Sequence, residues 1–179
     1  MAYDDKDEER KRLLHFLAAR KSATNEELVL VEDSESPDFI CRKPDGTLVG
    51  VEHTRILYDP EAMEIRQVCG DDDADVDNFA VVWDASVAVA KKEAIRRKPH
   101  WRLPASTILV LDLVDRGRFE SWPTDDAMSD EFEGSGFVEV WISDHSSLAA
   151  FSRVTAIGLY PRSIWGIRGQ GYLSGVPFK

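Results

Sequence analysis

Several features that define whole classes of protein are missing from this sequence. The 179-residue chain has only two cysteines, Cys41 and Cys69, which are too few for a disulfide framework or a cysteine-ligated zinc site. It has no apolar run near the ~20 residues that a helix needs to cross a bilayer, and its first residues contain no apolar signal-peptide core. We therefore expect both cysteines to be buried apolar residues of a cytoplasmic protein without a membrane partner.

Basic residues are also in the minority. Asp and Glu number 33 against 22 Lys and Arg, which gives a formal net charge of −11 with histidine neutral. This balance excludes a protein that coats nucleic acid by its overall charge, although it is compatible with a local basic surface. The sequence also lacks the phosphate-binding loop of P-loop proteins and the GxSxG nucleophile motif of α/β-hydrolases.

The hydrophobic pattern predicts an α/β fold in which helices flank a mixed central sheet. Apolar stripes and helix start and stop signals predict helices over residues 4–20, 59–70 and 77–98. Apolar runs predict strands over residues 38–43, 47–56, 107–114, 136–142, 154–160 and 164–167. The length suits a single domain over residues 1–179 with its core at about 5–168. The glycine-rich run 166–171 begins no helix, so we predict a C-terminal loop or tail over residues 169–179.

A hairpin is predicted next, and its register can be counted from its turn. Residues 44–46 are Pro-Asp-Gly, which suits a three-residue loop with the glycine in the left-handed position. Lys43 then pairs with Thr47, and counting outward sets Asp38 opposite Glu52. The period of two sorts the side chains into a buried face, with Phe39, Cys41, Val49 and Val51, and a second face, with Asp38, Ile40, Gly50, Glu52 and Thr54.

The two carboxylates on the second face predict a cation site. Like charges directly opposite each other on adjacent strands are destabilising by up to ~1 kcal/mol, so a fold normally avoids them unless a cation lies between them. Mg²⁺ (or Mn²⁺) prefers such oxygen ligands and keeps several waters that a substrate can displace. A slip of one residue would separate Asp38 from Glu52, but the apolar match of Phe39 with Val51 argues against it. The alternative is a hairpin whose two acids are merely solvated.

This segment resembles the PD-(D/E)XK nuclease superfamily, which has the restriction-endonuclease-like fold. Pro37-Asp38 matches the PD of the motif, and Glu52-His53-Thr54 stands in the place of (D/E)XK after thirteen intervening residues. The order of helix, hairpin, long helix and strand also fits, so the likeness covers roughly residues 5–115. The resemblance implies Mg²⁺-dependent hydrolysis of a phosphodiester, with Asp38 and Glu52 as metal ligands. It also implies a third acid from the first helix, for which Glu9 is better placed than Glu8.

The sequence departs from the motif at Thr54, where the family has a lysine. A threonine cannot supply the positive charge that orients the attacking water or steadies the developing phosphorane, and losing such a group typically lowers the rate by ~10²–10⁴. His53 alternates to the buried face, where we expect a hydrogen-bonded core histidine. From the predicted helix over residues 77–98, we predict that Lys91 or Arg97 reaches the site in place of the missing lysine. The alternative is that both are ordinary charges on the helix surface.

Charge is distributed unevenly, and this predicts partners. Residues 91–102 hold six bases and one acid, and no acid follows Asp144. Bases interleaved with aromatic residues favour binding of nucleic acid, DNA first, through residues 91–102 and the C-terminal segment. The acid-rich segments 71–77 and 125–133 suit a basic protein partner instead. Two alternatives to a nuclease therefore stand: an inactive nuclease-like fold that acts as an inhibitor or immunity-type protein-binding module, and a DNA-binding subunit that does not cut. The sequence predicts no oligomeric state.

Overall fold

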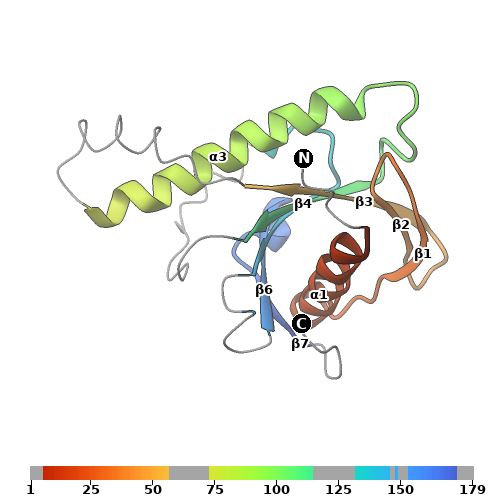
Figure 1. The fold of residues 1–179 in the computed structure, drawn as a ribbon, viewed down its shortest axis with the longest axis horizontal. Helices are drawn as coiled ribbons and strands as arrows, with labels where there is room; N and C mark the ends of the chain where they lie inside the picture. Colours follow the sequence, from red (N-terminus) through yellow and green to blue (C-terminus); the bar gives the residue numbers. More distant parts are fainter. Residues whose placement is uncertain (1–5, 57–72, 115–131, 146–147, 149–152, 173–179) are drawn as a thin grey trace.

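The computed structural model describes residues 6–56, 73–114, 132–145, 148 and 153–172, with the backbone alone for residues 73–84 (Figure 1). The helix predicted over residues 59–70, which contains Cys69, lies outside the described residues. None of the described helices combines the length and hydropathy that crossing a membrane requires. The elements follow the order α1 (Lys6–Thr24), β1 (Val29–Asp33), β2 (Phe39–Arg42), β3 (Leu48–Arg55), α3 (Asp73–Arg96), β4 (Thr107–Leu113), β5 (Glu139–Asp144), β6 (Arg153–Tyr160), the 3-10 helix η2 (Arg162–Ile164) and β7 (Arg168–Tyr172).

The described strands form one curled sheet of seven, and their order in the sheet is their order in the chain. The first three strands form an antiparallel meander, β3 pairs parallel with β4, and β4 pairs parallel with β5. The last three strands are antiparallel again. Because parallel neighbours need a crossover, α3 lies in the connection between β3 and β4. The prediction of a mixed sheet flanked by helices is confirmed.

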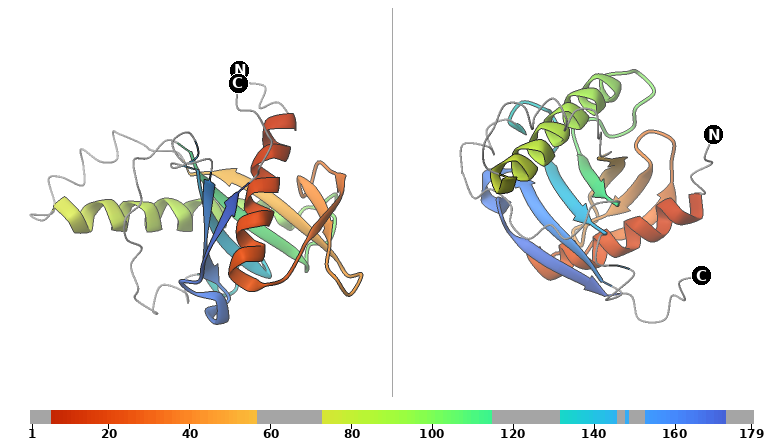
Figure 2. Two further views of the ribbon diagram at one scale, coloured as in Figure 1. Left: turned by 90° about the horizontal axis from the view of Figure 1, so that it is seen from below. Right: turned by 60° about the vertical axis from the view of Figure 1, so that its left-hand side comes forward.

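The two described α-helices cover opposite faces of the sheet (Figure 2). Helix α1 begins with three acids, which the positive end of the helix dipole stabilises. Its buried stripe, with Leu13 and Phe16, packs on the face of the sheet that carries Phe39 and Ile108. Helix α3 packs Ala85 and Val89 on the other face, against the side chains of β4 that alternate with those under α1. The sheet is therefore buried from both sides.

The hairpin of β2 and β3 has the register that the turn predicted. Phe39 faces Val51, and Arg42 faces Leu48. Gly46 has a φ of +89°, the left-handed conformation that a residue with a Cβ avoids. Cys41 is fully buried under α1, as predicted for it, and burial raises the pKa of its thiol to about 12. The paired register ends at Phe39 and Val51, and the two acids follow directly beyond this pair, where the backbone N–H of Asp38 donates to the Glu52 side chain.

The C-terminal prediction is wrong in two places. Residues 164–167 do not form a strand, and the run 166–171, predicted to be a loop, contributes to strand β7, which pairs with β6. In β7 the buried positions are Gly169 and Gly171, and α1 lies directly on them. A Cβ on Gly169 would lie 1.9 Å from the carbonyl oxygen of Ala19, so only glycine permits this contact. The strand thus extends beyond residue 168, where the predicted core ended.

Candidate functional site

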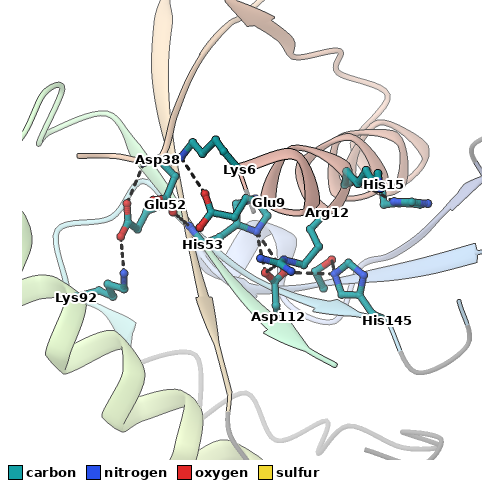
Figure 3. A network of polar contacts seen from close by, with 12 residues as sticks. Lys6, Glu9, Arg12, His15, Asp38, Glu52, His53, Lys92, Asp112 and His145 are labelled. Carbon is teal, nitrogen blue, oxygen red and sulfur yellow. Dashed lines mark hydrogen bonds and ion pairs between the residues drawn. The ribbon is translucent and has the colours of Figure 1, made fainter. Parts of the chain in front are cut away.

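The carboxylates of Asp38 and Glu52 lie against each other's strands. The backbone N–H of Asp38 donates to Oε2 of Glu52 over 3.1 Å, and the backbone N–H of His53 donates to Oδ2 of Asp38 over 2.8 Å (Figure 3). Local packing positions Asp38, because Pro37 covers Gly50 on β3 so closely that a Cβ there would be 2.5 Å from the proline ring. The structure therefore brings together the two acids that the sequence paired.

Both carboxyl groups are held at an electrostatic cost. Burial raises the pKa of Asp38, although the His53 hydrogen bond partly offsets this. Burial likewise raises the pKa of Glu52, and the negative charge of Asp38 raises it further. Glu52 is only 4% exposed. A positive charge between or beside the two acids would therefore be stabilising.

Lys92 of α3 supplies one such charge. Its Nζ lies 2.5 Å from Oε1 of Glu52, and this contact opposes the rise in the Glu52 pKa. The two bases predicted for this role are elsewhere: Lys91 is exposed, and Arg97 forms an ion pair with Glu93 within the helix. A basic residue of the helix does reach the acid pair, but it is Lys92 and not the predicted Lys91 or Arg97.

The choice of helix face explains why Lys92 was missed. The sequence favoured the stripe that contains Ser86 and Ala90, but Ala90 is exposed and the buried positions are Ala85 and Val89. Lys92 lies seven residues after Ala85 and three after Val89, and so continues the face that packs on the sheet. The sequence did contain a signal for Lys92, because the apolar positions Ala85 and Val89 lie on the same helix face as this lysine.

The remaining predicted site residues are placed as follows. Thr54 is half-buried on β3, two residues beyond Glu52. Glu9 lies at the start of α1 and pairs with Lys6 over 2.9 Å, and Figure 3 shows both near Asp38. Among the described residues no three His, Cys, Asp or Glu side chains are arranged to share a metal ion. The role of Glu9 as a third metal ligand therefore stays a prediction.

A buried carboxylate that the sequence did not single out lies next to this pair. Asp112 of β4 is 1% exposed, and both its oxygens lie within 3.2 Å of Nδ1 of His53. Nε2 of His145 lies 3.3 Å away and Nε of Arg12 lies 3.4 Å away. Burial alone would raise the pKa of Asp112, but the charges and hydrogen bonds of the two histidines outweigh burial and hold it well below its usual value. The available signal was a lone acid in the otherwise apolar run of β4.

The basic segment over residues 91–102 lies along the end of α3 and the loop after it. Lys91, Lys98 and His100 are exposed, whereas Arg102 pairs with Glu32 over 2.7 Å. Arg96 is half-buried and donates to the carbonyl oxygens of Pro104 and Ser135. Part of the predicted nucleic-acid surface is therefore committed to contacts within the protein.

Comparison of the chain with protein-family models, with curated proteins and with solved structures gives no significant match.

Proposed function

We propose that this protein is a PD-(D/E)XK-like nuclease that hydrolyses phosphodiester bonds of nucleic acid with Mg²⁺ or Mn²⁺. The observation that carries the proposal is the juxtaposition of Asp38, Glu52 and Lys92. The side chain of Glu52 on β3 contacts both the backbone of Asp38, which directly precedes β2, and the ammonium group of Lys92 on α3. In this proposal, Lys92 of α3 takes the role of the lysine expected at position 54.

The order of elements supports the same proposal. Helix α1, the meander of β1, β2 and β3, helix α3 and strand β4 follow one another, with helices on both faces of the sheet. Asp38 lies immediately before β2 and Glu52 lies within β3, the hairpin on which the restriction-endonuclease-like fold carries its acids.

The donor set fits a hard divalent cation. Mg²⁺ in proteins is typically bound by one or two carboxylates, with water and substrate phosphate as further ligands, so a third acid is not required. Within the described residues, Oδ1 of Asp38 accepts no hydrogen bond. Burial raises the pKa of both acids, and the charge of Asp38 raises that of Glu52 further. Asp38 and Glu52 would hold the ion. When bound, it would polarise the phosphate and favour ionisation of a water nucleophile.

The chain's own groups have separate roles in this proposal. The strand amides hold the two carboxylates in a fixed orientation before any ion binds. The side chain of Lys92 is more exposed than that of Glu52, at 21% against 5%, so in this proposal Lys92 is the more accessible of the two to a substrate. There it would orient the attacking water or stabilise the negative charge that develops on the phosphate.

Cleavage assays on duplex DNA, single-stranded DNA and RNA, with Mg²⁺ or with EDTA, test the proposal. Glu52→Gln should abolish cleavage, and Lys92→Met should lower the rate by ~10²–10⁴. Lys91→Met is the matched control, because it removes the same charge from the next residue of the helix, and it should retain activity. If the wild type cuts none of the substrates and calorimetry shows no Mn²⁺ binding that Glu52→Gln loses, the non-catalytic binding module becomes the better interpretation.

A further inference from the structure

The Asp112 cluster connects to the acid pair through a single residue, His53. The ring of His53 faces Asp112 on the α1 face of the sheet, where it also packs edge-on against Phe16 and Phe39. Its backbone N–H donates to Oδ2 of Asp38. The ring of His53 thus contacts Asp112, while its backbone amide orients the carboxylate of Asp38.

The direction of these hydrogen bonds follows from the charge on Asp112. Because the pKa of this carboxyl is lowered, it is ionised and can only accept hydrogen bonds. Nδ1 of His53 and Nε2 of His145 must therefore both carry a proton toward it. Arg12 reaches the same carboxylate from α1, one turn after Glu9. A single buried charge thereby joins α1, β3, β4 and the end of β5 immediately behind the site.

We infer that Asp112 is a positioning residue for the Asp38–Glu52 pair. By anchoring the ring of His53 it fixes the backbone amide that orients the Asp38 carboxylate. Its consequence for metal binding rests on the proposed function, whereas the orientation of Asp38 does not. Groups that hold a metal-ligating side chain in position, without touching the metal themselves, typically contribute 10–100-fold in metal affinity or activity.

The fold contains a matched control for this inference. Arg20 and Glu139 form a second buried ion pair between α1 and the sheet, with two hydrogen bonds of 2.9 and 2.8 Å. Glu139 begins β5, whereas His145 follows its end, so this pair lies at the opposite end of that strand. It makes no contact with Asp38, Glu52 or His53 among the described residues. Glu139→Gln and Asp112→Asn therefore each neutralise one acid of the sheet that forms an ion pair with an arginine of α1, although Glu139 is half-buried and Asp112 is fully buried.

The test compares these two variants by two measurements. The first is the ¹H chemical shift of the His53 backbone amide, with Asp38→Asn as the reference for a changed acceptor. The second is the Mn²⁺ dissociation constant from calorimetry. Asp112→Asn should move the amide resonance and weaken Mn²⁺ binding by about 10–100-fold. Glu139→Gln should leave the resonance in place and change the affinity by less than about twofold, although both variants lower stability.

Equal effects of the two variants on the amide resonance would overturn the inference. If the wild type binds no Mn²⁺, the proposed function fails, and the amide resonance alone still decides whether Asp112 positions Asp38. If Asp112→Asn does not fold, His53→Phe replaces it, because a phenyl ring retains the packing with Phe16 and Phe39 and removes only the anchor. The ¹H chemical shift of the residue-53 amide is then measured in His53→Phe and in the double variant with Asp38→Asn. If Asp38→Asn shifts this resonance as much in the His53→Phe background as in the wild type, the inference is contradicted.

Discussion

Replacing Asp38 with asparagine should stabilise the protein in the absence of metal. The amide oxygen can accept the 2.8 Å hydrogen bond from the His53 N–H in place of Oδ2. The amide nitrogen then takes the position of Oδ1, which accepts no hydrogen bond within the described residues. The substitution therefore keeps the one hydrogen bond to the Asp38 side chain and removes only the charge that faces Glu52.

The magnitude follows from the pairing of the two acids. Like charges directly opposite on adjacent strands cost up to about 1 kcal/mol, and the near-complete burial of Glu52 places this pair toward the upper end. A gain of about 1 kcal/mol raises the melting temperature of a protein of this size by roughly 2–4 °C. In Mg²⁺ the wild type should become the more stable of the two proteins. It gains about 1.4 kcal/mol when the free Mg²⁺ concentration is ten times its Kd, whereas the Asp38→Asn variant binds the ion weakly.

Urea and thermal unfolding in EDTA, and again in Mg²⁺, measure both effects. Glu35→Gln is the control, since Glu35 is exposed, lies three residues from Asp38 and carries the same charge. This control should leave both curves unchanged. If Asp38→Asn in EDTA is less stable than the wild type by about 1 kcal/mol or more, the two acids do not repel each other appreciably, and the reasoning that makes them a cation site is refuted.

Three further results are expected. Lys92→Met should raise the pKa of Glu52, because it removes the ammonium group that opposes the rise, whereas Lys91→Met should not; carboxyl NMR titrations distinguish them. In EDTA, the raised pKa values of the acid pair mean that the native state binds these protons more tightly, so their contribution to stability falls as the pH rises through the folded-state values. The lowered pKa of Asp112 has the opposite effect: its contribution to stability is present above its ordinary pKa of about 4 and is lost as the pH falls through the folded-state value. Urea unfolding across this pH range should show a different dependence of the unfolding free energy on pH for the wild type and for Asp112→Asn. Parallel dependences would contradict this prediction. Gly171→Ala should cost about 1–3 kcal/mol by overpacking the contact between α1 and β7, and unfolding midpoints unchanged from the wild type would show that α1 can move aside.

The acid pair could be predicted because its geometry is local. The turn over residues 44–46 sets the register, and the alternation of Phe39 and Cys41 with polar neighbours sets the faces. Nothing distant in the chain is needed to bring Asp38 to Glu52. The mixed sheet flanked by helices could be predicted for the same reason, since each strand has its own apolar pattern.

The residues that were missed depend on packing between distant elements. Lys92 reaches Glu52 only because Ala85 and Val89 form the buried face of α3, and a helix with apolar residues on several sides does not specify that face. Asp112 is held by three groups from distant parts of the chain, which lie on β3, directly after β5 and on α1. Strand β7 alternates polar residues with glycine, so its buried positions carry no hydrophobic signal, and α1 alone makes them buried.

The contact between α1 and β7 also has a consequence for the order in which the protein can fold. Ala19 and Gly169 touch across nearly the whole length of the chain, and such contacts form late because a long loop must close first. During synthesis from the N-terminus, α1 leaves the ribosome early but lacks this part of its docking surface until β7 has followed it. Arg12, which lies on the same helix, can therefore settle fully against Asp112 only after β7 has been synthesised. A nascent chain that has not yet reached β7 would carry both acids of the hairpin, but α1 would lack this part of its contact with the sheet next to Asp112.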